Sequence, residues 1–295
     1  MSRCLIVYFS QGGTTRRVAE AVSTGLRAQG HEVDLHDLED GPPPAHGRYE
    51  VLGVGCPAHY YRPAIVVSDY LENLPDLSGK PVFTFVLHAA YLGDAGNVVR
   101  RLLAEKGGKE LGYARFRGAG HFLGYLKHGY RFSPADPNSD AIARAERFGG
   151  ELAARLARET HVLAAHDPPP PAVYQLERFL TGRFFIRHLY SKLFRVDGNK
   201  CSHCTLCMKG CPTRNIREDH KGRRVWGREC ILCFACEMNC PREAISSPMT
   251  WSMFWPFMVY NTWSAARDPA IEHVRVVHAN GRTTVLPAPQ RRDGD

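Results

Sequence analysis

Eight of the ten cysteines fall into two copies of one spacing, and this spacing is typical of iron–sulfur ligation. Each copy reads Cys-x2-Cys-x2-Cys-x3-Cys-Pro. Three closely spaced thiolates can hold three corners of a four-iron cubane, while the fourth cysteine of the same run ligates the other cluster. The spacing therefore predicts two [4Fe–4S] clusters with crossed ligand sets. One set is Cys201, Cys204, Cys207 and Cys240, and the other is Cys230, Cys233, Cys236 and Cys211.

Zinc and disulfide bonds are the alternatives for these cysteines. Zinc sites usually close with two Cys-x2-Cys pairs or with cysteine and histidine, which explains neither the third cysteine of each run nor the Cys-Pro pairs. His203 lies in the first run, but a Rieske-type site needs two histidines in place of two cysteines. Ile216 and Ile245 occupy equivalent places after the two runs, which predicts two pseudosymmetric halves around the clusters.

A candidate phosphate site lies near the N-terminus, in the turn after the first apolar segment. The turn reads Ser10-Gln11-Gly12-Gly13-Thr14-Thr15. Small residues let backbone N–H groups close around a phosphate, hydroxyls add donors, and a helix that begins there directs its positive end at the anion. The turn has neither the Gly-x-Gly-x-x-Gly of dinucleotide sites nor the Gly-Lys-Ser/Thr of nucleotide-triphosphate loops. We therefore expect it to hold a single phosphate.

Two further loops follow apolar segments and have the composition to contact a flat ring. Both supply small residues for close backbone approach and an aromatic side chain that can stack. Each tyrosine taken alone is equally well explained as a half-buried residue on a rim. Cys4 is most simply a core thiol, and Cys56 is a candidate for the lining of the ring site. The candidate residues are Pro57, Ala58, His59 and Tyr60 in the first loop and His88, Ala89, Ala90, Tyr91 and Gly93 in the second.

The elements that would position these loops alternate between apolar strands and amphipathic helices, which predicts an α/β domain with a parallel sheet covered on both faces. Five strands and their crossovers fit a doubly wound sheet, where a ligand binds beyond the carboxyl ends of the strands at the topological switch point. Strands are expected near 4–9, 32–35, 51–54, 82–87 and 111–117, and helices near 14–29, 64–74, 97–106 and 139–164.

Over residues 1 to 246 the chain resembles the family of flavodoxin–ferredoxin fusion proteins. The first turn resembles the Ser-x-Thr-Gly-x-Thr phosphate loop of flavodoxins, with Ser10, Gly13 and Thr15 matching best. Gln11-Gly12 and His88-Ala89-Ala90 depart from the commoner Gly-Thr and Thr-x-Gly-Gly forms. The resemblance implies an FMN-binding, flavodoxin-like domain, followed by a small α+β domain of the bacterial ferredoxin type with two [4Fe–4S] clusters.

The sequence as a whole suggests four segments. We expect the flavodoxin-like domain at 1–166, a Pro-rich linker and a basic amphipathic helix at 167–196, the ferredoxin domain at 197–247 and a C-terminal extension at 248–295. The amphipathic helix most often packs against a neighbouring domain, with partner docking or contact with a membrane surface as alternatives.

The aromatic stretch 249–263 is too short, and too interrupted by Pro256, to cross a bilayer. We interpret this stretch as a lid packed on the clusters or on the flavodoxin domain, or, if exposed, as a docking patch. The pair Asn280-Gly281 between two apolar segments predicts a hairpin. Residues 291–295 are expected to be disordered.

A chain of 295 residues has room for roughly two domains, and its formal charge of +8 with a pI near 9.0 suggests an anionic partner. No nucleic-acid-binding module is recognisable, so we expect a redox protein with an acidic surface rather than a nucleic acid. Contact with a membrane would be peripheral.

The first residues show no signal peptide, and cysteines arranged for metal suit a reducing compartment, which favours the cytoplasm. The sequence leaves the oligomeric state undetermined.

Three functions remain open at this point. The first is an electron-transfer iron–sulfur flavoprotein that relays electrons between FMN, two clusters and a separate redox enzyme. The second is an FMN-dependent reductase of a small organic acceptor, for which His59 and His88 are acid candidates by loop position only. The third is an oxygen or iron sensor with a structural cluster, which no DNA-binding segment supports.

Overall fold

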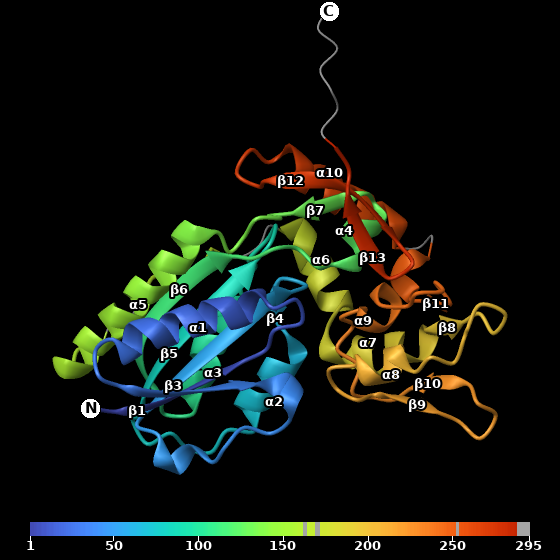
Figure 1. Cartoon of the computed structure of the whole chain (residues 1–295). Coiled ribbons are helices and arrows are strands. Elements are labelled where there is room, and N and C mark those ends of the chain that lie inside the picture. The colour runs from blue at the N-terminus through green and yellow to red at the C-terminus, as the bar shows by residue number, and fades with distance from the viewer. Residues whose placement is uncertain (162–163, 169–171, 252–253, 288–295) are drawn as a thin grey trace, which may run out of the picture. The chain divides into compact units, whose positions relative to one another are not determined.

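The computed structural model describes residues 1–161, 164–168, 172–251 and 254–287, and the chain forms two compact units (Figure 1). The first unit consists of Met1–Ala119 and Ala135–Gly182. The second consists of Gly120–Pro134 and Arg183–Asp295. These units divide the chain differently from the boundaries expected from the sequence. Residues 120–134, expected in the N-terminal domain, belong to the second unit. Residues 167–182, expected in the linker segment, belong to the first unit.

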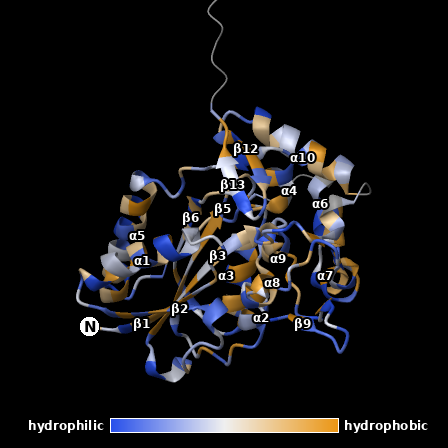
Figure 2. Ribbon diagram, turned by 45° about the vertical axis from the view of Figure 1, so that its right-hand side comes forward, coloured by the Kyte–Doolittle hydropathy of each residue, from blue (hydrophilic) through white to orange (hydrophobic). Residues whose placement is uncertain are grey.

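A five-stranded parallel sheet forms the centre of the first unit, with the strand order β2-β1-β3-β5-β6. This doubly wound order is the one predicted from the sequence, and its switch point lies between β1 and β3. The strands β1 and β5 are coloured largely orange in Figure 2, as expected for strands buried on both faces. The strands are β1 (Arg3–Tyr8), β2 (Glu32–Asp37), β3 (Val51–His59), β5 (Pro81–His88) and β6 (Lys109–Arg117), and the short β4 (Arg62–Pro63) pairs antiparallel with the end of β3.

Helices cover both faces of this sheet (Figure 1). The helices α1 (Thr14–Arg27) and α5 (Ser139–Ala157) pack together on one face, and α2 (Ile65–Glu72) and α3 (Ala95–Glu105) cover the other. The α1–α5 contact requires glycine, because a Cβ on Gly25 would lie 2.0 Å from the carbonyl oxygen of Glu146. Two 3-10 turns, η1 (Leu38–Asp40) and η2 (His46–Arg48), follow β2.

The segment after α5 departs from the expectation of a helix to residue 164. The helix ends at Ala157, and Glu159 has a φ of 52°, in the left-handed region. Asp167 is then buried, where its carboxylate accepts from Tyr113 and pairs with Arg115, while its backbone N–H donates to Asn97. The start of the expected linker is therefore fixed to the first unit. Pro169–Pro171 lie outside the described residues.

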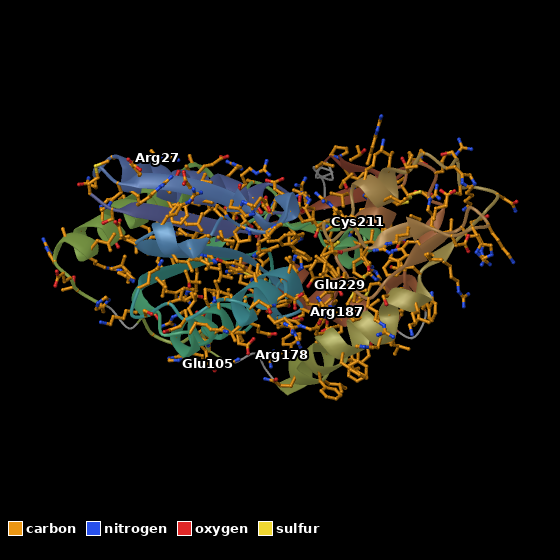
Figure 3. The ribbon with its side chains drawn as sticks, turned by 90° about the horizontal axis from the view of Figure 1, so that it is seen from below. Arg27, Glu105, Arg178, Arg187, Cys211 and Glu229 are labelled. Carbon is orange, nitrogen blue, oxygen red and sulfur yellow. The ribbon has the colours of Figure 1, made fainter. Side chains whose placement is uncertain are left out.

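Two helices occupy the region where one amphipathic helix was expected. The first, α6 (Ala172–Leu180), belongs to the first unit, and α7 (Arg183–His188) with η3 (Tyr190–Leu193) begins the second. In the second unit Ile186, Tyr190 and Phe194 are buried, whereas Leu189 is exposed. An ion pair of 3.2 Å between Arg187 and Glu229 joins α7 to the segment before the second cysteine run (Figure 3).

The cysteine-rich region has the pseudosymmetry that its sequence repeat predicts. The strands β8 (Arg195–Val196) and β11 (Ile245–Ser246) pair, as do β9 (Ile216–Glu218) and β10 (Arg224–Trp226), so each antiparallel pair joins one strand of each repeat. The short helices α8 (Leu206–Lys209) and α9 (Ala235–Met238) occupy equivalent places. Left-handed backbone conformations also recur at equivalent positions, at His203 and Leu232, Thr205 and Phe234, and Arg214 and Glu243.

The C-terminal extension contains η4 (Pro248–Thr250), α10 (Trp255–Arg267) and the strands β12 (His273–Ala279) and β13 (Arg282–Val285). The predicted hairpin is confirmed, with positive φ at Asn280 and Gly281 as a type I′ turn requires. None of the described helices combines the length and the apolarity needed to span a membrane. The expected disordered end, 291–295, lies outside the described residues.

Residues 120–134 form a short insertion that the sequence did not reveal. Its helix α4 (Leu123–Lys127) contacts α10, and its strand β7 (Tyr130–Phe132) pairs antiparallel with β12, which completes a three-stranded sheet. In α10, Met258, Asn261 and Ala265 are buried, while Trp255, Tyr260 and Trp263 are exposed. The aromatic tail is thus a helix packed on the insertion.

Candidate functional site

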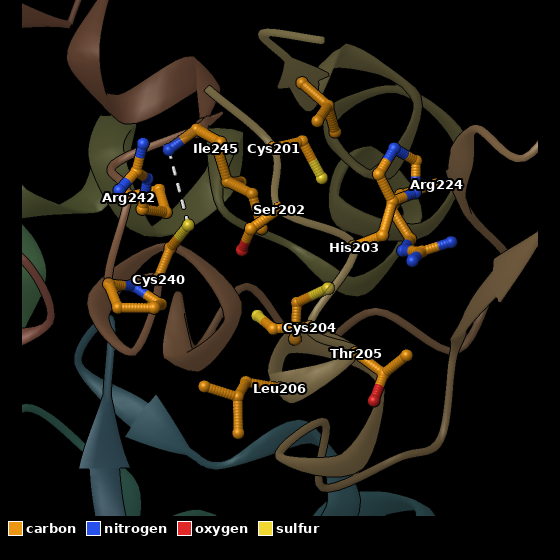
Figure 4. A pocket seen from close by; sticks show the side chains of 14 residues that line it. Cys201, Ser202, His203, Cys204, Thr205, Leu206, Arg224, Cys240, Arg242 and Ile245 are labelled. Carbon is orange, nitrogen blue, oxygen red and sulfur yellow. Dashed lines mark hydrogen bonds between the residues drawn. The ribbon is translucent and has the colours of Figure 1, made fainter. Parts of the chain in front are cut away.

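The first set of cysteines lines one pocket of the second unit, with an empty volume of about 370 Å³ (Figure 4). Cys201, Cys204 and Cys207 come from the first run, and Cys240 comes from the end of the second. The Sγ atom of Cys240 accepts a hydrogen bond of 3.3 Å from the N–H of Ala244, drawn as the dashed line in Figure 4. The structure therefore brings together the four cysteines of the first predicted ligand set.

The second set is Cys230, Cys233, Cys236 and Cys211. Burial raises the pKa of Cys230 to about 11 and that of Cys233 to about 12, and the charge of Cys211 adds to the rise at both thiols and at Cys236. The Sγ atom of Cys211 accepts from the N–H of Asn215 at 3.4 Å, the equivalent of the Ala244 contact in the other repeat. Cys211 thus lies near enough to the three cysteines of the second run for its charge to act on their thiols, as crossed ligation requires.

Four thiolates around one space are the donor set of a [4Fe–4S] cluster, whose sulfur ligands surround a four-iron core. Both sets have this composition, so the residues fit the predicted group. Within the described part of the chain, no three His, Cys, Asp or Glu side chains gather closely enough to hold a single metal ion.

The two cysteine sets differ in their surroundings. In the first set Cys204 is exposed and Cys240 is buried, whereas in the second set Cys230 and Cys236 are buried and no cysteine is exposed. Aromatic rings pack near the second run, where Phe194 stacks on Trp226 at a centroid distance of 5.0 Å. Phe234 of the run itself lies 6.0 Å from Phe122 of the insertion and 6.3 Å from Phe194. The second set therefore has the less polar and less hydrated environment.

The phosphate turn connects β1 to α1 at the carboxyl edge of the sheet. The Oγ atom of Ser10 accepts from the N–H of Arg16 at 3.1 Å, which leaves the hydroxyl hydrogen of Ser10 available to an anion. Gly13 has a φ of 79°, and a Cβ there would meet no atom within 4 Å, so this side of the turn is open. The first turn of α1 contains no acidic residue, and its N–H groups lack intrahelical partners. These features fit a bound phosphate.

The loop after β3 lies beside the phosphate turn. The ring of His59 contacts Phe9 edge-on at 6.0 Å, and the N–H of Phe9 donates to the carbonyl of Gly55. The pairing of β3 with β4 makes this loop a tight hairpin whose tip is Tyr60-Tyr61. Both tip residues have positive φ, 51° and 63°. Bulky residues seldom adopt such angles, and observed outliers of this kind cluster at functional sites.

The loop after β5 is joined to this hairpin. The N–H of Asp94 donates to the carbonyl of Tyr61 at 3.0 Å, and a Cβ on Gly93 would lie 2.3 Å from the same oxygen. Only glycine permits this approach, and its φ of 64° also favours glycine. Residues 57–61 and 88–94, called the flavin loops from here on, therefore form one connected surface at the ends of β3 and β5.

Burial keeps the two histidines of the flavin loops uncharged. It lowers the pKa of His59 to about 4, and the pKa of His88 also falls to about 4, through burial first and the charge of Arg117 second. At neutral pH both side chains are neutral imidazoles. They can hydrogen-bond a polar ring edge, but they carry no imidazolium charge.

The remaining predicted residues fall as follows. Ser10, Thr15 and Ala90 are buried, and Gly12 is exposed. Cys4 lies in the core of the first unit, and Cys56, also buried, directs its Sγ atom to the carbonyl of Pro57 at 3.2 Å. The half-buried candidates are Gln11, Gly13, Thr14, Pro57, Ala58, His59, Tyr60, His88, Ala89, Tyr91 and Gly93.

The sequence did not single out Asp94 within the second flavin loop, nor Tyr174 and Arg178 of α6, which contact the flavin loops. Asp94 precedes α3 directly, where an aspartate is expected to cap the helix. The sequence around it therefore did not indicate a second role. Tyr174 and Arg178 follow the Pro-rich segment, and nothing in their spacing indicates the loops 80 and more residues earlier in the chain that they contact.

Comparison with known proteins agrees with this geometry. Residues 5–125 match the family model of the flavodoxin domain, and residues 193–241 match that of a 4Fe–4S dicluster domain. The chain is a flavodoxin–ferredoxin fusion. The resemblance seen in the sequence is thus confirmed, and the two domains support an electron-transfer role as an iron–sulfur flavoprotein with FMN and iron–sulfur clusters as cofactors.

Solved structures similar to the fusion include a flavodoxin from the domain Archaea (16% identity, TM-score 0.41, covering 52% of the fusion and 99% of that chain). The flavodoxin of Megasphaera elsdenii has 21% identity and a TM-score of 0.41, covering 51% and 98%. The rubredoxin oxygen:oxidoreductase of Desulfovibrio gigas has 15% identity and a TM-score of 0.43, covering 54% and 37%. A search of curated proteins found no match in sequence.

Proposed function

We propose that the fusion is an electron-transfer protein that holds one FMN and two [4Fe–4S] clusters and exchanges electrons with a separate redox protein. One observation carries this proposal. The chain that carries the phosphate turn and the flavin loops also lines one pocket with Cys201, Cys204, Cys207 and Cys240, and its Cys211 lies near enough to Cys233 for its charge to act on that thiol. FMN exchanges one or two electrons and a cubane exchanges one, so the bound groups together link single-electron to pair chemistry.

The residues of the first unit divide the binding of FMN among three segments. Ser10 and the N–H groups at the start of α1 would hold the phosphate, supported by the positive end of a 14-residue helix. The flavin loops would hold the ring, with the backbone of 57–58 and 89–90 close to it and Tyr60 or Tyr91 against its face. The neutral imidazoles of His59 and His88 would bond its polar edge.

The environments of the two cysteine sets support a division of roles. The first set is the one with an exposed cysteine, and Leu206, Lys209 and Arg242 around it are exposed as well. We assign the exchange with the partner to this face. An exposed leucine flanked by cations suits a redox protein with an acidic surface, which agrees with the net charge of +8.

An FMN-dependent reductase of a small acceptor is the alternative. It needs a proton donor beside the ring, and the candidates by position are His59 and His88. Burial keeps both neutral at neutral pH, so neither supplies the acidic proton of an imidazolium. The neutral state of both histidines favours the electron-transfer role over the reductase.

The decisive experiment is anaerobic purification of the full chain with iron, sulfide and flavin analysis. We expect about eight iron, about eight sulfide and about one FMN per chain, and FMN rather than FAD or a nicotinamide. Zinc without iron, or a chain that takes up no FMN, would contradict the proposal. Reoxidation of the reduced protein by an acidic redox protein, slowed by salt, would support the partner. Reoxidation only by a small organic acceptor would favour the reductase.

A further inference from the structure

Helix α6 contributes one ring to a cluster of three tyrosines on the flavin loops. The ring centroid of Tyr174 lies 4.7 Å from that of Tyr61 and 5.2 Å from that of Tyr91, and Tyr61 and Tyr91 are 5.9 Å apart. Tyr61 and Tyr174 are both only 6% exposed. One side chain from beyond the Pro-rich segment thus packs against both flavin loops.

Polar contacts join the same helix to the same loops. The guanidinium of Arg178, labelled in Figure 3, forms an ion pair with the carboxylate of Asp94. The guanidinium of Arg62, which follows the Tyr60-Tyr61 tip, donates to the carbonyl oxygen of Arg178. Helix α6 is therefore attached to the β3–β4 hairpin and to the loop after β5.

Asp94 shows that the contact with α6 replaces a local one. It is the N-cap residue of α3, where an aspartate normally accepts from the N–H groups of the first helical turn. Its side chain makes no such capping bond. The carboxylate pairs with Arg178 instead, while its backbone N–H donates to Tyr61. This residue links α6, α3 and the hairpin tip.

The hairpin tip needs support from outside itself. Two-residue hairpin turns with positive φ at both positions favour Asn-Gly, whereas this turn consists of two tyrosines. Backbone strain of this kind persists only where the surrounding structure holds it. Here the surroundings are the rings of Tyr91 and Tyr174 on Tyr61 and the bond from Asp94 to its carbonyl oxygen.

We propose that α6 is a clamp that holds the flavin loops in the conformation that binds FMN, with Tyr174 and Arg178 as positioning residues. The helix lies outside the matched flavodoxin segment, 5–125. The inference rests on the proposed function, because FMN is the ligand whose affinity the clamp sets. It adds that flavin binding depends on an element beyond the flavodoxin domain.

The test is an anaerobic FMN titration of the flavin-free full chain, followed by quenching of flavin fluorescence. Tyr174→Ala and Arg178→Met should each raise the dissociation constant about tenfold or more, since loops that are ordered only part of the time bind with proportionally lower apparent affinity. Tyr174→Phe keeps the ring and should bind like the wild type. Phe179→Ala is the matched control, because Phe179 is on the same helix but 64% exposed.

Hydrogen exchange of the flavin-free proteins separates positioning from general stability. In Tyr174→Ala, peptides covering the flavin loops should exchange faster, while those covering β1 and β5 remain as in the wild type. Unchanged FMN affinity in Tyr174→Ala and Arg178→Met would overturn the clamp. Tighter binding in Tyr174→Ala would also overturn it, because Tyr174 would then obstruct the ring site. If the wild-type protein binds no FMN, the proposed function is wrong, and the clamp proposal, which rests on it, is wrong as well.

Discussion

Lys127 of the insertion forms an ion pair with Glu237 of α9, next to Cys236 of the second cysteine run. The side chain of Glu237 is 4% exposed, and its other oxygen accepts from the N–H of Ser247 at 2.8 Å. A residue inserted into the flavodoxin sequence thus compensates a buried charge in the ferredoxin fold. The insertion is part of the structural support of the second cysteine set.

Removing this cation should destabilise the second unit. Lys127→Met leaves the Glu237 carboxylate buried with one partner fewer, at a cost of about 1–3 kcal/mol. We expect loss of cluster absorbance at lower denaturant concentration in the anaerobic holoprotein. Lys209→Met, on the exposed side of α8, is the control and should unfold like the wild type. Equal midpoints for both variants would show that the pair contributes nothing measurable.

Replacing single cysteines should reveal the crossed ligation. Cys240→Ser should damage the cluster held by Cys201, Cys204 and Cys207, and Cys211→Ser should damage the other. Each variant should retain roughly four of about eight iron, because four ligands hold each cubane. The two variants should differ in the electron paramagnetic resonance signal of the surviving cluster. Cys56→Ala, in the first unit, should keep all the iron. Damage in Cys240→Ser confined to the cluster of Cys230 and Cys233 would refute the crossing.

The phosphate turn can be tested with a pair of matched glycines. Gly13 and Gly30 flank the two ends of α1, have φ of 79° and 81°, and both face open space. Alanine in the left-handed region costs on the order of 1 kcal/mol at either position, so both variants should lose similar stability. Only Gly13→Ala adds a methyl group where a phosphate has to approach, and it should weaken FMN binding measured by fluorescence titration. Equal FMN affinities in the two variants would place the phosphate elsewhere.

The first unit should lose stability in mild acid because of His59 and His88. Their pKa values of about 4 in the folded state lie below the ordinary 6.5. Between about pH 6.5 and 4 the unfolded chain binds protons that the folded chain does not, so stability falls as the pH falls through this window and is constant above it. Each pKa unit corresponds to about 1.4 kcal/mol, which makes an effect on the order of 1–3 kcal/mol for each histidine.

Hydrogen exchange of β3 and β5 peptides in the flavin-free protein, corrected for the intrinsic pH dependence of exchange, measures this effect. Substituting both histidines by asparagine should flatten the protection between pH 7 and pH 5. His161→Asn, at an exposed position of the same unit, should leave the slope as it is. A wild-type protein whose β3 and β5 protection is the same at both pH values would disprove the assignment.

The sequence by itself determined the two cysteine runs, the glycine turn between β1 and α1, the five strands of the sheet and the Asn280-Gly281 hairpin. These features depend on local chemistry. Ligand spacing, strand periodicity and the positive φ that glycine tolerates are all properties of short segments, so a short segment suffices to predict them. The pseudosymmetry of the cysteine region could be predicted for the same reason, because the two halves repeat one pattern in the sequence.

Only the tertiary structure decided where Tyr174, Arg178 and Lys127 act. Tyr174 packs against Tyr61 and Tyr91, and Lys127 pairs with Glu237, across long separations in the chain. Nothing in the local pattern of either residue specifies its partner, since a buried tyrosine or a lysine in a short helix has the same local pattern wherever it packs. Their partners are set by the folding of the whole chain. Folding packs apolar rings against one another and pairs a buried charge with an opposite one, because an unpaired buried charge is costly.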